Sequence, residues 1–261
     1  MPPLVFVLLD GVAAQPARRC MSHMLALEAA GQARYTELEC ELPPLSRPAY
    51  ATLFSGLPPA QSGILHNDAV HLCPLPTVFA RARDAGLTTA AAAYFWISEV
   101  CNSSPYDPAR HRLTHDPTLP IAHGLFYSHD AYPDQDLFHD AACLFRRFRP
   151  HLLLVHAMGA DCAGHAHGGD SEAYHEAIRQ ADGLLARWMP EWLAAGSTLV
   201  VTSDHGMDAH GSHYDDLERI RRVPFWLAGA QAQDLALPQS QRAVAALMEK
   251  ALGIAPETRK S

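Results

Sequence analysis

Five short apolar runs recur along the chain and restrict its fold more than any other feature of the sequence. None of them alternates polar with apolar residues, as a half-buried strand does. The runs lie at Leu4–Leu9, Thr88–Tyr94, Leu152–His156, Thr198–Thr202 and Pro224–Leu227. This pattern is typical of parallel strands that are buried on both faces.

Helical signals fill the stretches between these runs. The clearest helix is expected over Glu172–Ala195, with Ser171 as its N-cap residue, Pro190 as the position where it ends or kinks, and Gly196 closing it. Its expected buried stripe comprises Tyr174, Ile178, Ala181, Leu185 and Trp188. Further helices are expected at Pro76–Ala85, Asp136–Arg149 and Ser240–Leu252. The alternation of strand and helix predicts an α/β/α sandwich with a mostly parallel central sheet.

The composition narrows the classes of protein that fit. The chain has 261 residues, of which 48% are hydrophobic, enough for one sizeable core. Its formal charge of −8 argues against a nucleic-acid binder that relies on a basic face. It contains no run of about 18 apolar residues, so no membrane span is expected. Six scattered cysteines indicate neither a disulfide scaffold nor a zinc ribbon.

The beginning of the chain is interpreted as a buried strand and not as a signal peptide. The run Leu4–Leu9 has no basic segment before it, and Asp10-Gly11 follows at once. The cytoplasm is therefore the expected compartment. Residues 97–135 break the strand–helix rhythm and are rich in Pro, Asp, His, Ser and Tyr. We expect a cap-like insertion there, because long irregular segments in compact domains are often functional. A plain irregular excursion is the alternative.

Metal-type ligands follow three of the predicted strands. Asp10 ends the first strand, although an ordinary Asp-Gly turn also explains it. Asp161 and His165 lie four residues apart after the third strand, and His167 nearby is interpreted as a solvated loop histidine. Asp204 and His205 end the fourth strand, and His213 follows nine residues after Asp204, with an exposed polar loop as the alternative. Carboxylate oxygen combined with imidazole suits Zn²⁺ or Mn²⁺.

Ser46 opens a predicted helix that ends at Gly56, with Pro48 in its first turn. One interpretation makes Ser46 a simple N-cap. The other makes it a nucleophile that the helix N-terminus and a metal ion activate.

Taken in order, the segments around Asp10, Ser46, Asp161/His165 and Asp204/His205/His213 resemble the alkaline phosphatase superfamily, and its type I phosphodiesterase/nucleotide pyrophosphatase branch most. The resemblance spans residues 4–229, with 97–135 poorly matched. It implies a single alkaline phosphatase-like domain over residues 1–261, with the cap-like insertion at about 97–135.

The resemblance also implies roles for individual residues. One metal ion would be held by Asp161, His165 and His213, and a second by Asp10, Asp204 and His205. Ser46 would lie between the two ions, bonded to the second, and Asn67 would hold a phosphate oxygen. The implied activity is hydrolysis of a small phosphate ester, a phosphodiester or nucleotide pyrophosphate, through a covalent phospho-Ser46 and two divalent ions, with Zn²⁺ ahead of Mn²⁺.

Several departures keep alternatives open. Nucleotide pyrophosphatases of this type use Thr in place of Ser46, and Ser62 replaces the family's usual His before Gly-Ile. Ser46-Arg47-Pro48-Ala49 matches the opening of the sulfatase nucleophile motif, but Tyr50 stands where that motif has Arg. A phosphomonoesterase would add a cationic side chain on the phosphate, for which Arg47 is the candidate. A mutase fits less well, because the insertion is small. A non-catalytic metal-binding protein with a degenerate site is the alternative from another class. The sequence does not indicate an oligomeric state.

The segment Tyr94-Phe95-Trp96 has two interpretations. It falls where the family often places aromatic residues near the substrate, so it could stack on a base or an aryl group. Core packing at the end of a strand explains it equally well.

Overall fold

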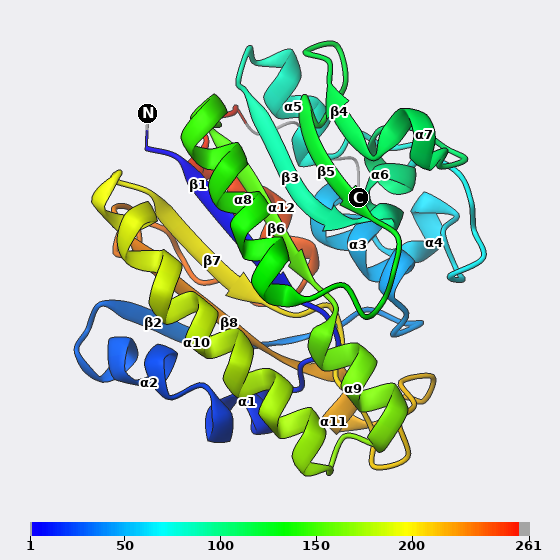
Figure 1. Ribbon diagram of the computed structural model, residues 1–261, viewed down its shortest axis with the longest axis vertical. Helices are drawn as coiled ribbons and strands as arrows, with labels where there is room; N and C mark the ends of the chain where they lie inside the picture. The colour runs from blue at the N-terminus through cyan, green and yellow to red at the C-terminus, as the bar shows by residue number, and fades with distance from the viewer. Residues whose placement is uncertain (1, 256–261) are drawn as a thin grey trace.

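The computed structural model describes residues 2–255, and their central feature is an eight-stranded sheet with helices on both faces (Figure 1). The strand order across the sheet is β2-β8-β7-β1-β6-β3-β5-β4. The strands are β1 Leu4–Leu9, β2 Ala33–Glu39, β3 Thr89–Tyr94, β4 Leu113–His115, β5 His123–Tyr127, β6 Leu152–Ala157, β7 Thr198–Thr202 and β8 Arg222–Gly229.

The middle of the sheet is parallel. Strand β1 pairs in parallel with β6 and β7, and β3 pairs in parallel with β6 and β5. Antiparallel pairs occur only toward the two edges of the described sheet, where β8 pairs with β7, β2 with β8 and β4 with β5. The predicted mostly parallel α/β architecture is therefore confirmed.

Helices cover the sheet in two layers. In Figure 1, α8 and α10 lie in front of the sheet, and α3 and α12 lie behind it. Within residues 2–255, no helix combines the length and the apolar character that crossing a bilayer requires. The helices are α1 Ala14–Cys20, α2 Ser22–Ala29, α3 Ser46–Ser55, α4 Pro59–Ser62, α5 Val78–Asp84, α6 Phe95–Cys101, α7 Pro108–His111, α8 Asp134–Phe148, α9 Gly159–His167, α10 Glu172–Ala194, α11 Glu218–Arg221 and α12 Arg242–Ala251.

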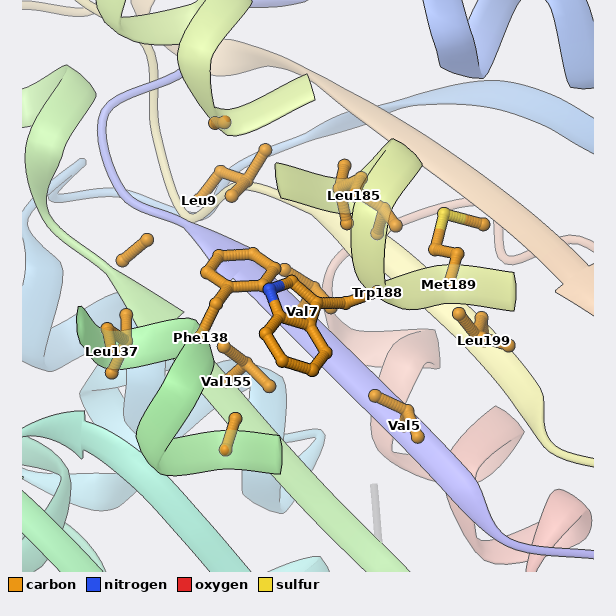
Figure 2. Close-up of a cluster of buried hydrophobic side chains, with 14 of the residues drawn as sticks. Val5, Val7, Leu9, Leu137, Phe138, Val155, Leu185, Trp188, Met189 and Leu199 are labelled. Atoms are coloured by element: carbon orange, nitrogen blue, oxygen red, sulfur yellow. The ribbon is translucent and has the colours of Figure 1, made fainter. Parts of the chain in front are cut away.

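Strand β1 contributes to both hydrophobic cores. Its residues Val5, Val7 and Leu9 face the layer of α8 and α10, and Figure 2 shows them beside the rings of Phe138 and Trp188. The alternate residues of the strand, Leu4, Phe6 and Leu8, belong to the other core, with side chains of α3, α5 and α12. Burial on both faces explains why this strand has no polar alternation.

The predicted strands agree closely with the structure, but three strands were missed. Strands β1 and β7 have the predicted bounds, and β3 and β6 differ by one residue. The missed strands are β2, β5 and β4. Strand β2 carries exposed polar side chains, and β4 has only three residues, so neither contains a continuous apolar run. An edge strand needs only one buried face, and its sequence differs accordingly.

Helix α10 has the predicted start but passes its proline. The Ser171 hydroxyl accepts a hydrogen bond from the Tyr174 backbone N–H, as expected of an N-cap. The expected stripe is buried in full. The helix does not end at Pro190 and continues to Ala194, one residue short of the expected range Glu172–Ala195. Met189 and Trp192 are fully buried on either side of the proline, and their burial offsets the backbone hydrogen bond that proline removes.

The segment 97–135 forms one edge of the fold. Strand β5 pairs with β3, and β4 pairs with β5, so residues 113–127 extend the central sheet. Helix α6 begins directly after β3. The stretch 128–133 then connects β5 to α8 near the carboxyl ends of the strands, and it is the part of the segment that remains as a candidate cap.

The substitution Leu185→Ala tests the hydrophobic core between the sheet and helices α8 and α10. Leu185 is fully buried, whereas Leu113 on β4 is 70% exposed. We expect Leu185→Ala to lower the free energy of unfolding by about 2–5 kcal/mol, because it leaves a cavity. The same change at Leu113 should cost less than about 0.5 kcal/mol. Urea unfolding followed by circular dichroism measures both, and equal costs would contradict the packing described.

Candidate active site

The predicted ligand-bearing segments meet at one end of the sheet. Asp10 directly follows β1, and Asp204 and His205 follow β7, which pairs with β1. Helix α9, which carries Asp161, follows β6 on the other side of β1. Carboxyl ends of adjacent parallel strands share an edge, and ligand sites of open α/β sheets gather there.

Two compact groups of potential ligands result. Asp161, His205 and His213 form one, and Asp10, Asp204 and His205 form the other, with the ligand atoms of each group within 4.8 Å of one another. His205 belongs to both groups, so the two groups are adjacent. All five side chains are buried.

His165, the remaining predicted ligand, lies at the rim of the first group. Its Nε2 is 3.4 Å from Asp161 Oδ2, and its ring centroid is 5.0 Å from that of His213. Its side chain is more exposed than those of the two groups. The nearby His167 is exposed at the end of α9, as its interpretation as a solvated histidine requires.

The three imidazoles are oriented alike. His205 Nδ1 lies 3.0 Å from the carbonyl oxygen of Gly206, His213 Nδ1 lies 2.8 Å from that of Pro44, and His165 Nδ1 lies 2.8 Å from that of Gly211. A carbonyl only accepts, so each Nδ1 carries the proton and donates. Each Nε2 then keeps its lone pair, which is the arrangement found in histidines that ligate metal ions.

The three carboxylates are buried together, and no lysine or arginine of residues 2–255 pairs with any of them. Burial raises the pKa of Asp10 to about 7. Burial, and then the neighbouring Asp10 charge, raise the pKa values of Asp161 and Asp204 well above the usual range. Among residues 2–255, no group donates a hydrogen bond to Asp10 Oδ1, Asp161 Oδ1 or Asp204 Oδ2.

This donor set fits divalent cations. Buried carboxylate oxygens without partners are costly, and a cation placed among them removes both the desolvation penalty and the mutual repulsion. Burial also lowers the pKa of His213 to about 4, so this imidazole is neutral and able to ligate near neutral pH. Oxygen and imidazole ligands together suit Zn²⁺ or Mn²⁺.

Ser46 faces this cluster. It is the first residue of α3, while Leu45 occupies the N-cap position, so Ser46 is not the N-cap of its helix. Its Oγ lies 3.2 Å from Nε2 of His205, the imidazole that both ligand groups share. Asn67 is held nearby, because its Oδ1 accepts a hydrogen bond from the Arg47 backbone N–H at 3.1 Å. Because that bond uses Oδ1, the Nδ2 amide group of Asn67 can still donate a hydrogen bond to a ligand.

Comparison with known proteins assigns the family. The family model of type I phosphodiesterase/nucleotide pyrophosphatase matches residues 4–246. The chain belongs to this family. It lies within the alkaline phosphatase superfamily, and its family generally depends on divalent metal ions.

Solved structures share the fold of this phosphodiesterase-family chain. Murine ectonucleotide pyrophosphatase/phosphodiesterase 5, solved as an inactive variant in complex with AMP, has a TM-score of 0.71 at 14% identity, covering 100% of this chain and 97% of that one. The C-terminal periplasmic domain of EptC from Escherichia coli has a TM-score of 0.67 at 14% identity, covering 97% and 82%.

A curated relative matches a shorter stretch. GPI ethanolamine phosphate transferase 1 of Saccharomyces cerevisiae is 32% identical over 84 residues, which are 30% of this chain and 9% of the yeast protein. The matched region is thus a small part of that relative.

The side chain of Arg47, the candidate cation for a phosphate group, already contacts other groups of the protein. Its guanidinium pairs with Glu99 at 2.5 Å, and both side chains are buried. It also stacks on the Trp96 ring at 4.6 Å and donates to the Ala69 carbonyl at 3.3 Å. The positive charge next to Ser46 is therefore largely neutralised by the protein itself.

The aromatic segment at the end of β3 packs mainly on itself. Tyr94 is buried, and its ring lies against those of Phe95, Trp96 and Tyr127. Burial, and then the nearby carboxyl group of Asp130 in the stretch 128–133, raise the pKa of the Tyr94 hydroxyl. The charge of Asp130 also contributes to the raised pKa values of Asp10 and Asp161, so this stretch lies near the site.

Sequence reasoning missed two residues that contact Asp10. Tyr50 of α3 and His156 of β6 both place polar atoms on its carboxylate. A usable signal was present, because His156 interrupts an otherwise apolar buried strand. Tyr50 also lies four residues after Ser46, on the same side of the helix.

Gly11 sets how closely Asp10 and Asp161 approach. Its φ is +70°, and a Cβ there would lie 2.8 Å from both Cα and Oδ1 of Asp161. Gly31 has a φ of +69° but open space around it. Gly31→Ala should cost about 1–2 kcal/mol of stability, the penalty of the left-handed conformation alone. Gly11→Ala should cost more and should also weaken Zn²⁺ binding in a calorimetric titration. Equal Zn²⁺ affinity in the two variants would contradict this account.

Proposed function

We propose that this chain hydrolyses phosphodiesters by transferring the phosphoryl group first to Ser46 and then to water, with two divalent ions in the two ligand groups. Zn²⁺ is the first candidate and Mn²⁺ the second. The observation that carries the proposal is the 3.2 Å approach of Ser46 Oγ to His205 Nε2, at the junction of both ligand groups. A serine at a helix N-terminus and against a metal centre is placed for nucleophilic attack.

The proposed ligand sets follow the resemblance. Asp10, Asp204 and His205 would hold the ion nearer to Ser46, and Asp161 and His213 would hold the other, with His165 reaching in from the rim. When bound, such ions lower the pKa of a hydroxyl and neutralise charge on phosphoryl oxygens.

The reaction would have two displacements. Ser46 Oγ attacks phosphorus, its bond to phosphorus forms, and the bond to the leaving alkoxide breaks, with a proton passing to the alcohol that departs. Water then attacks the phosphoserine, which restores the Ser46 hydroxyl and releases a phosphate monoester. Asn67 Nδ2 would donate to a non-bridging oxygen in both steps, as an oxyanion-type donor that acts without reorganisation.

The ion pair of Arg47 with Glu99 supports a diester over a monoester as the substrate. A monoester dianion carries one more negative charge than a diester, and it benefits from an additional cation. Arg47 next to Ser46 is buried against Glu99, so it supplies little net charge to a bound phosphate. A phosphomonoesterase or a sulfatase of the same superfamily and a non-catalytic metal-binding protein are the alternatives to be separated by experiment.

Three substrates distinguish these functions. The purified chain, with Zn²⁺ or Mn²⁺ added, should hydrolyse bis-p-nitrophenyl phosphate faster than p-nitrophenyl phosphate or p-nitrophenyl sulfate. Ser46→Ala should lose about three or more orders of magnitude in kcat, because the nucleophile is gone. Ser46→Thr retains a hydroxyl and should keep part of the activity. Near-normal turnover by Ser46→Ala would reject the nucleophile, and a preference for the sulfate or the monoester would reject the diesterase. Activity on none of the three would favour a binding protein.

Glu99→Gln tests the role of the neutralised arginine. Removing the Glu99 charge leaves Arg47 with a full positive charge beside Ser46, so the ratio of monoesterase to diesterase activity should rise by about tenfold, equivalent to about 1.4 kcal/mol. Stability should fall by about 3–5 kcal/mol, the cost of breaking a buried pair.

The matched control for this variant is Glu249→Gln. It removes a carboxylate from another buried pair, with Arg81, in which the two groups are 3.3 Å apart. It should destabilise the protein without changing the activity ratio. An unchanged ratio in folded Glu99→Gln would show that Arg47 does not govern the choice of ester.

A further inference from the structure

A closed triangle of polar groups lies behind the metal-ligand cluster. The Tyr50 hydroxyl donates to Asp10 Oδ2, and His156 Nε2 lies 3.0 Å from the same oxygen. The Tyr50 hydroxyl oxygen and His156 Nε2 are 3.2 Å apart, which closes the triangle. The two rings meet edge to face, with centroids separated by 4.9 Å. All three side chains are fully buried.

The triangle gives the two carboxylate oxygens of Asp10 different hydrogen-bond partners. A carboxylate that ligates a cation is ionised and only accepts, so in that state His156 Nε2 carries the proton and donates to Oδ2, as the Tyr50 hydroxyl does. Oδ2 is thereby occupied by two donors. Oδ1 receives none from residues 2–255 and lies 3.6 Å from His205 Nε2, on the side of the ligand group. The two oxygens of the neighbouring Asp204 differ in the same way. Its Oδ1 accepts a hydrogen bond from the Gly11 N–H at 3.2 Å, and its Oδ2 has no donor among residues 2–255.

Packing alone does not explain these two residues. His156 stands at a position of β6 where the flanking strand residues are apolar, and within the described chain its Nδ1 has no hydrogen-bond partner. A buried imidazole with one unsatisfied nitrogen is costly relative to an apolar side chain of similar size. Among residues 2–255, Nε2 has hydrogen-bond contacts to Asp10 and Tyr50 alone. The contact of His156 with Asp10 is therefore the reason we give for a histidine at this buried position.

We infer that Tyr50 and His156 are positioning residues, which fix the Asp10 carboxylate so that Oδ1 alone is presented to a divalent ion. Tyr50 has a second effect, because it lies one helical turn after Ser46 on α3. Its bond to Asp10 ties the helix that carries the nucleophile to the strand end that carries the ligand. Partners of this kind behind a metal ligand typically affect metal affinity or activity by about 10- to 100-fold.

The inference rests on the proposed function, and its test does not need the activity. Zn²⁺ is titrated calorimetrically into the metal-stripped full-length chain and into Tyr50→Phe, His156→Leu and His156→Gln. Tyr50→Phe removes only the hydroxyl, and His156→Leu removes the donor at similar volume. His156→Gln retains an N–H that can reach Oδ2. The control is Tyr127→Phe, because the buried Tyr127 hydroxyl donates to the His156 backbone carbonyl at 2.8 Å and not to Asp10.

The expected result is selective. Tyr50→Phe and His156→Leu should bind one Zn²⁺ about 10- to 100-fold more weakly than the unmodified chain while the other Zn²⁺ is held as before. His156→Gln should recover part of the loss, and Tyr127→Phe should bind as the unmodified chain does. In the diesterase assay, kcat should fall in the first two variants with little change in KM.

Three outcomes would overturn the inference. Zn²⁺ affinity within twofold of the unmodified chain in Tyr50→Phe would do so, and that variant answers the question even where His156→Leu fails to fold. An equal loss in Tyr127→Phe would show general loosening at the end of β6. Failure of His156→Gln to recover any affinity, in a folded variant, would remove the donor as the cause. If the chain binds Zn²⁺ as described but hydrolyses no ester, the proposed function fails and the positioning role stands.

Discussion

Three carboxylates share one buried space at the end of the sheet, and the arrangement of the surrounding residues answers this constraint. Asp10, Asp161 and Asp204 repel one another, and burial removes the water that would screen them. Such a cluster is relieved when carboxyl groups take up protons, as their raised pKa values indicate, or when a cation binds among them, and a rigid frame is needed to hold it together. Here the parallel pairing of β1 with β6 and β7 supplies the frame, and each of the three carboxylates keeps one oxygen without a hydrogen-bond partner among the described residues.

The frame depends on hydrogen bonds that the backbone makes to one side of Asp204, His205 and His213. The backbone N–H of Gly11 holds one oxygen of Asp204, and backbone carbonyls hold Nδ1 of His205 and His213. In each case the protein satisfies the atom that points away from the cluster and leaves the atom that points into it. Ligand direction is thereby set before any ion binds, which lowers the reorganisation that binding requires.

The sequence was sufficient to predict the strands that carry the site, because these follow from local patterns, whereas the grouping of the ligand residues came from the family resemblance. Continuous apolar runs mark central strands, and Asp or His directly after such a run must lie at the carboxyl edge. Edge strand β2 could not be found in this way, since pairing with β8 and not its own pattern makes it a strand. Pairwise contacts were also beyond prediction. Nothing local indicates that Arg47 is neutralised by Glu99, 52 residues away, or that Tyr50 and His156 meet on Asp10.

The position of His205 connects the two ligand groups to Ser46. Its Nε2 is within 4.8 Å of ligand atoms of both groups and 3.2 Å from Ser46 Oγ, so an ion bound through this nitrogen necessarily lies close to the serine. The N-terminus of α3 directs its partial positive charge at the same place, while Glu99 cancels the side-chain charge of Arg47. In the proposed reaction, attraction for a phosphate group would therefore come from fixed dipoles and from bound divalent ions, and little of it from the side chain of Arg47. On the proposed mechanism, such a site would gain less from the second negative charge of a monoester than a site with an unpaired arginine would.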